Sequence, residues 1–221
     1  MESAKYFKIE IWSDIQCPFC YIGKRKIEKA LEAFEGKDKV QIEWRSYQLD
    51  PEARSQPGVD LYDYLAERKG QTREWAIEMH KNVTAMAKEN GLDYHFEKAI
   101  LANSYNAHRL IHLAKKHNKG NDAEERIFKA YFTEGKDIAS EQTLFELGRE
   151  IGLEEKEIKA VVNSDEYGDA VRSDIEEAMN IGVRGVPFFV FNREYAVSGA
   201  QPVEIFTQTL EKSFEAWKQN K

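Results

Sequence analysis

Two cysteines, two residues apart, are the side chains of this sequence best suited to redox chemistry. Cys17 and Cys20 are the only cysteines of the chain and lie in the stretch SDIQCPFCYIGK, residues 13–24. A thiolate attacks a disulfide, and a second thiol nearby displaces the sulfur that the first has captured. The CPFC motif therefore predicts a redox dithiol, with Cys17 as the nucleophile and Cys20 as the resolving thiol.

The position of the pair at the start of a predicted helix supports these roles. Pro18 suits the first helical position, where its missing N–H is not needed, and this places Cys17 at the N-cap. The positive end of a helix dipole stabilises a thiolate, so we expect a lowered pKa for Cys17. We also expect solvent to reach its sulfur. Cys20, one turn later, is expected about 5 to 6 Å away, within the range that a disulfide bridges.

Two other interpretations of the cysteines remain open. A zinc site would need two further ligands, and His108 and His112, four residues apart, do not have the usual finger spacing. A buried, unreactive pair of small apolar side chains is the second alternative. The proline between the cysteines and the strand-to-helix context argue against it.

The neighbours of the pair add no positive charge. Phe19 is neutral, and Asp14 would repel a thiolate if it faces Cys17, whereas it is a solvated loop acid or a cap if it does not. We therefore expect a reduction potential toward the reducing part of the range of about -270 to -120 mV.

Hydrophobic periodicity predicts the elements that position the cysteines. Alternating apolar and polar residues predict four strands: 7–12, 39–47, 186–191 and 195–199. Amphipathic spacing predicts a helix over 21–34 and another over 203–217. A strand, a helix and a second strand in that order form a right-handed crossover with parallel strands, and the last two strands form a hairpin.

The segment between these parts is helical in pattern. Residues 49–182 suit five or six helices, with Ser140 as one N-cap. The expected helix ends lie at Gly91, Gly120, Gly152 and Gly182. The resulting fold class is α/β: a thioredoxin fold (β-α-β … β-β-α) with a large helical domain inserted between the two halves. We expect a thioredoxin-like domain of residues 1–48 and 183–221 and an insertion domain of residues 49–182.

Composition narrows the class of protein. The 221 residues carry 32 Lys and Arg against 39 Asp and Glu, for a net charge of -7, and the basic residues are scattered, so no nucleic-acid partner is expected. No stretch approaches the about 18 uninterrupted apolar residues of a membrane span, and no signal peptide is evident. We expect no membrane partner and a cytoplasmic protein, where a lone cysteine pair is more often catalytic than structural.

Five segments together resemble one family. They are SDIQCPFCYIGK, ANSYNAHRL (102–110), RIFKAYFTEGKDI (126–138), GVRGVPFFVFN (182–192) and SGAQP (198–202). In this order they resemble the FrnE-type, DsbA-like thioredoxin superfamily, which includes 2-hydroxychromene-2-carboxylate isomerases and is related to kappa-class glutathione transferases. The resemblance implies that Pro187 is cis and faces the cysteines, so that the backbone of Val186 docks an extended substrate.

The resemblance also implies a substrate site. Its expected members are Val186, Ser13, Asp14, Asn103, His108 and Arg109. Arg109 would bind a carboxylate and His108 would transfer a proton, although surface or capping roles are equally open for both.

The expected activity is thiol–disulfide exchange of the reductase or isomerase type. Its partners would be disulfide-containing proteins or peptides, with glutathione as an optional co-substrate, no resident cofactor and no metal. A homodimer is compatible with the resemblance. The alternatives are a glutathione-dependent isomerase or transferase acting on a small aromatic substrate, and a binding module without catalysis. The second cysteine favours dithiol chemistry over the glutathione-dependent alternative, and a binding module predicts that Cys17→Ser leaves activity intact.

Overall fold

The computed structural model describes residues 6–56 and 58–220. The chain divides into two compact units, one of Met1–Tyr47 with Arg172–Lys221 and the other of Gln48–Val171. Whether residues 1–48 with 183–221 and residues 49–182 form separate domains stays a prediction. Among the described residues, no helix is both long and apolar enough to cross a membrane.

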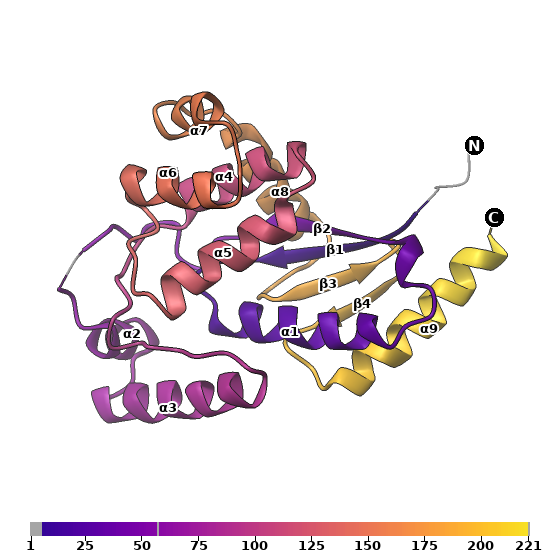
Figure 1. Cartoon of the computed structure of the whole chain (residues 1–221). Helices are drawn as coiled ribbons and strands as arrows, with labels where there is room; N and C mark the ends of the chain where they lie inside the picture. The colour runs from indigo at the N-terminus through magenta and orange to yellow at the C-terminus, as the bar shows by residue number, and fades with distance from the viewer. Residues whose placement is uncertain (1–5, 57, 221) are drawn as a thin grey trace. The chain divides into compact units, whose positions relative to one another are not determined.

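The first unit is built on one four-stranded sheet, and the α/β thioredoxin order expected from the sequence is confirmed (Figure 1). The strands are β1 (Phe7–Ser13), β2 (Val40–Ser46), β3 (Phe188–Phe191) and β4 (Tyr195–Ser198). They lie in the order β2-β1-β3-β4; β1 and β2 are parallel, and the other two pairs are antiparallel. Its helical elements are α1 (Pro18–Glu32), the 3₁₀ turn η1 (Lys37–Lys39), most of α8 (Gly168–Asn180) and α9 (Val203–Gln219).

The two faces of this sheet carry different helices. Side chains alternate along a strand, so Ile11 and Ser13 of β1 share one face with Phe189 of β3. The helices α1 and α9, side by side in Figure 1, pack on this face: Phe189 lies edge-on to Phe206 of α9 at 4.7 Å between ring centroids. A Cβ on Gly23 of α1 would lie 3.1 Å from Phe189. Glycine at residue 23 therefore lets α1 approach the sheet closely.

The opposite face is covered by α8. Trp12 packs there with a buried apolar cluster that includes Ala178, and its indole N–H donates to the Asp174 carbonyl at 2.8 Å. Nearby, Arg45 of β2 donates to the Glu10 carboxylate at 2.6 and 3.1 Å and to the Asp174 carboxylate at 2.9 Å. Glu10 and Asp174 are only 1% and 2% exposed, so both buried charges depend on these partners.

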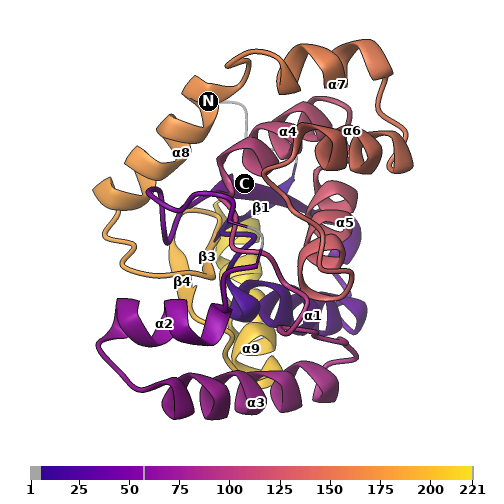
Figure 2. The ribbon, with the colours of Figure 1, turned by 90° about the vertical axis from the view of Figure 1, so that its left-hand side faces the viewer.

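The second unit is helical. Its described residues contain α2 (Leu61–Lys69), α3 (Arg73–Glu89), α4 (Tyr105–Lys116), α5 (Gly120–Phe132), α6 (Glu141–Glu150), α7 (Glu155–Val162) and the start of α8. With α8 these are seven helices, where the sequence predicted five or six. Figure 2 shows α2 beside α3, and α4 against α5 and α6, pairs that also pack in the structure.

The expected helix boundaries are mostly confirmed. Ser140 is the N-cap of α6 and accepts from the Thr143 N–H at 3.4 Å, and Gly91, Gly152 and Gly182 follow helices with φ of 73°, 74° and 81°. The prediction for Gly120 is wrong, because this residue begins α5. The left-handed residue after α4 is Asn118, with φ of 58°, since asparagine also tolerates that conformation.

Candidate functional site

Cys17 lies where β1 passes into α1. It is the N-cap of α1, with φ of -88° and ψ of 109°, and Pro18 follows at the first helical position, as predicted. The Cys17 N–H donates to the Asp14 carbonyl at 2.9 Å, which closes the turn between the strand and the helix. This local geometry places both cysteines in the first turn of the helix.

The Cys17 sulfur contacts a residue far away in the chain. Its thiol donates to the Val186 carbonyl at 3.4 Å, across 169 residues of sequence, and accepts no hydrogen bond from the amides of α1. The expected contact with unpaired helix N–H groups is therefore not formed in this protonated state. The Val186–Pro187 peptide is cis, as the resemblance implies, and the Pro187 carbonyl is held by the Gly199 N–H at 2.8 Å.

Cys20 is completely enclosed, with 0% of its surface exposed. Burial raises the pKa of the Cys20 thiol well above its ordinary value of 9.0, and a hydrogen bond with Cys17 and the charge of Cys17 raise this pKa further. The Asp14 N–H and the Ser13 hydroxyl lower the pKa of Cys20 in part. Both cysteines are free thiols in contact, and the raised pKa keeps Cys20 protonated.

The expectation that solvent reaches the Cys17 sulfur is wrong for this arrangement. Cys17 is only 3% exposed, while its chain neighbours Gln16, Pro18 and Phe19 are half-buried. The Cys17 side chain therefore presents little surface to a substrate disulfide.

Ser13 and Asp14, expected to contact a substrate, are each 0% exposed, so their geometry does not support that role. The idea of Asp14 as a solvated loop acid is wrong for the same reason. Its carboxylate accepts from the Gln16 N–H at 3.3 Å and so closes a turn before the cysteines. The Ser13 Oγ is buried and has no hydrogen-bond partner in the geometry of the described residues.

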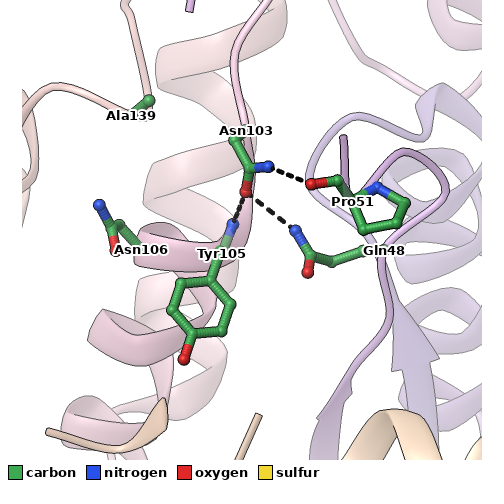
Figure 3. Close-up of a pocket in the computed structure, with 6 residues that line it drawn as sticks. All are labelled: Gln48, Pro51, Asn103, Tyr105, Asn106 and Ala139. Carbon is green, nitrogen blue, oxygen red and sulfur yellow. Dashed lines mark hydrogen bonds between the residues drawn. The ribbon is translucent and has the colours of Figure 1, made fainter. Parts of the chain in front are cut away.

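The second unit holds Asn103, which lines a cavity of about 370 Å³ with Gln48 and Asn106 (Figure 3). The Asn103 amide donates to the carbonyls of Pro51 and Ala53 at 2.9 and 3.0 Å. Its oxygen accepts from the Gln48 side chain at 2.9 Å and from the N–H of Tyr105 at 2.8 Å. All four hydrogen-bonding positions of the amide are used, so Asn103 ties the loop after β2 to the start of α4.

His108 and Arg109 are both buried in α4, at 2% exposed. The Arg109 guanidinium donates to the Glu166 carbonyl and the Asn106 side chain, each at 2.9 Å, and to the carbonyls of Val161 and Ser164. These contacts satisfy backbone groups at the end of α7. The geometry does not support Arg109 as a clamp for a substrate carboxylate.

Sequence reasoning missed Gln48 and Asn106 at the cavity, because a lone amide in a loop or a first helical turn carries no pattern. The position of Asn103, His108 and Arg109 relative to the cysteines stays a prediction. Within residues 6–56 and 58–220, no three His, Cys, Asp or Glu side chains gather where they could hold a metal ion.

Comparison with known proteins identifies the family. The model of the DSBA-like thioredoxin domain matches residues 8–211. The chain belongs to the DsbA-like thioredoxin domain family. This confirms the resemblance at that level, while the narrower FrnE assignment stays a prediction.

Three known proteins illustrate the similarity. The uncharacterized protein YwbO of Bacillus subtilis (strain 168) is 29% identical over 206 residues, which are 91% of this chain and 94% of YwbO. The probable DsbA oxidoreductase SCO1869 from Streptomyces coelicolor is 37% identical to this chain, with a TM-score of 0.89. The match covers 95% of this chain and 91% of SCO1869. The cytosolic disulfide reductase DsbM from Pseudomonas aeruginosa shares the fold, with 17% identity and a TM-score of 0.67. The match covers 95% of this chain and 99% of DsbM.

Proposed function

We propose that this protein is a thiol–disulfide oxidoreductase in which Cys17 attacks a substrate disulfide and Cys20 resolves the mixed disulfide. The observation that carries the proposal is the asymmetry of the two thiols. Cys20 is enclosed and held protonated, whereas Cys17 caps α1 beside the Val186 carbonyl. Two adjacent thiols with different environments suit two successive steps of exchange.

The chemistry proceeds in two displacements. The Cys17 thiolate forms a bond to one sulfur of the substrate disulfide, and the other substrate sulfur leaves as a thiolate. The Cys20 thiolate then bonds to Cys17, and the first substrate sulfur leaves. The two protons given up by the cysteines end on the two substrate thiols. The substrate disulfide is reduced, and the protein dithiol is oxidised to a disulfide.

Val186 has a separate part in the proposal. Its carbonyl binds the Cys17 thiol in the reduced protein and is released when Cys17 becomes part of a mixed disulfide. Its backbone groups are then available to pair with an extended substrate beside Cys17. Because Cys17 is only 3% exposed, a small disulfide should react faster than a disulfide within a folded protein.

Glutathione disulfide is a suitable small substrate. Another structure of DsbM, 18% identical to this chain with a TM-score of 0.64, holds glutathione. In a cytoplasm with a glutathione potential of about -220 to -320 mV, the pair would be kept reduced, which favours reduction or isomerisation of substrates over net oxidation. A cytoplasmic location and a homodimer are part of this proposal as expectations.

Trapping tests the proposal directly. The Cys20→Ser variant, mixed with glutathione disulfide, should accumulate protein that carries one glutathionyl group, detected by mass spectrometry. The Cys17→Ser variant is the matched control and should carry none. Adducts on the Cys17→Ser variant, or their absence from Cys20→Ser, would contradict the assigned roles. Turnover of a chromene-type substrate with glutathione, unaffected by Cys20→Ser, would favour a glutathione-dependent isomerase instead.

A further inference from the structure

Ser13 and Cys20 meet on the same side of the sheet. Ser13 is the last residue of β1 and shares the alternating face with Ile11, against which α1 packs. Cys20 is in the first turn of α1, and both residues are 0% exposed. The turn that joins them is short and is closed by the hydrogen bond from the Cys17 N–H to the Asp14 carbonyl.

The Ser13 hydroxyl is not used elsewhere. Its oxygen is buried and has no other hydrogen-bond partner in the described part of the chain. The backbone of Ser13 is held independently, because its carbonyl accepts from the Tyr47 N–H at 2.9 Å. A buried hydroxyl with no partner is unfavourable for stability, which makes a purely structural role for the side chain a poor explanation.

The resolving step creates a demand that this hydroxyl can meet. Cys20 must lose its proton within an enclosed space before it attacks the mixed disulfide, and a buried thiolate needs donors around it. Only the Asp14 N–H and the Ser13 hydroxyl oppose the burial of Cys20 among the groups that most affect its pKa. The hydroxyl can rotate to donate to a thiolate, whereas the backbone amide cannot be altered by substitution.

We propose that Ser13 is a positioning residue for the resolving step, whose hydroxyl donates a hydrogen bond to the Cys20 thiolate as it forms. The inference rests on the proposed function, since it assigns a helper to the second displacement only. Ser13 keeps its own proton and forms no covalent bond. The first displacement, at Cys17, does not require it.

The expected effect follows from the strength of such a hydrogen bond. A hydrogen bond to a charged group shifts an equilibrium by about tenfold or more, so Ser13→Ala should lower the thiolate fraction of Cys20 about tenfold. A more basic thiolate is also a better nucleophile, by about threefold for such a change. Below its pKa, Cys20 should therefore resolve the mixed disulfide about three- to fourfold more slowly in the variant.

The two displacements can be separated with DTNB, an aromatic disulfide that releases a coloured thiolate at each step. In stopped-flow mixing with the reduced full chain, the first phase should be proportional to DTNB concentration and the second independent of it. Ser13→Ala should leave the first phase unchanged, slow the second as stated, and move the pH profile of the second upward by about one unit. Ser13→Thr keeps a hydroxyl and should restore the wild-type profile.

Ser213 provides a matched control. It is also 0% exposed, but its hydroxyl bonds to the Leu210 carbonyl of its own helix at 3.2 Å. Ser213→Ala should leave both phases unchanged. An unmoved pH profile in Ser13→Ala, or an equal shift in Ser13→Thr, would overturn the role of Ser13 while the proposed function stands. A second phase that is proportional to DTNB concentration would overturn both.

Discussion

The protonated state of Cys20 has a consequence for stability that can be measured. Its pKa is raised well above 9.0 in the folded protein by burial, followed by the hydrogen bond and charge of Cys17. Below pH 9 this thiol is protonated in both the folded and the unfolded chain. As pH rises above 9, the unfolded thiol ionises and the folded thiol does not, so the unfolded state is stabilised and the free energy of unfolding falls.

The size of the loss in unfolding free energy follows from the ionisation of Cys20 in the unfolded chain alone. For an unfolded thiol that ionises at pH 9.0 and a folded thiol that stays protonated, the free energy of unfolding falls by about 1.4 kcal/mol at pH 10. At pH 10.5 the loss reaches about 2 kcal/mol. Relative to a typical stability of about 5 to 15 kcal/mol, this is readily detected.

Urea unfolding of the reduced protein at several pH values from 7.5 to 10.5 measures this effect. Lysines and tyrosines also ionise in this range, so the quantity of interest is the difference between wild type and Cys20→Ala. That difference should shrink as pH rises from 7.5 to 10.5, by up to about 2 kcal/mol. In Cys17→Ala, most of the pH dependence should persist, because burial is its largest cause. Parallel pH curves for wild type and Cys20→Ala would refute the enclosed, protonated thiol.

Three further predictions concern groups that stabilise the fold within each of the two units. Arg45→Met removes a main partner of the buried Glu10 and Asp174 carboxylates and should lower the free energy of unfolding by about 3 kcal/mol. The control Arg149→Met breaks an exposed ion pair and should lower the free energy of unfolding by less than about 1 kcal/mol. Equal losses in urea unfolding would contradict this prediction. His80 contacts the rings of Tyr62 and Phe96, and burial lowers its pKa. As pH falls below about 6.5, the unfolded chain binds the proton more readily than the folded one, so stability is lost. His80→Phe should therefore show a smaller fall in Tm between pH 7.5 and 5.5 than the wild type does. Both Gly135 and Gly182 have positive φ, but a Cβ at Gly135 would lie 2.6 Å from the Lys98 carbonyl oxygen, whereas a Cβ at Gly182 would meet open space. Gly182→Ala should lower the free energy of unfolding by about 1 kcal/mol, and thermal unfolding should show a clearly larger loss for Gly135→Ala.

Several parts of the site could be predicted because they depend on neighbouring residues. The N-cap position of Cys17 and the start of α1 at Pro18 follow from the chemistry of a helix terminus, which involves only one turn of chain. The parallel pairing of β1 and β2 and the hairpin of β3 and β4 follow from connection length and handedness. Gly120 failed as a helix end because Asn118, two residues earlier, could adopt the same left-handed backbone.

Other parts could not be predicted because they depend on which side chains meet across the fold. The family resemblance implied that Asn103 and Arg109 bind a substrate. In the structure, their donors are taken up by the backbone of Pro51, Ala53, Val161 and Ser164. No local pattern indicates which carbonyls a loop leaves unsatisfied, so the partners of these two side chains emerge only when the chain is folded.

The amino-acid sequence by itself determined the family, the order of strands and helices, and the place of a dithiol at a helix start, because these properties are carried by short motifs and by periodicity along the chain. Only the tertiary structure decided that Cys17 donates to Val186, 169 residues away, that Cys20 is enclosed, and that Ser13 faces α1 rather than solvent. Burial and long-range hydrogen bonds belong to the packed molecule, and burial sets the protonation of the Cys20 thiol on which the proposed second displacement depends.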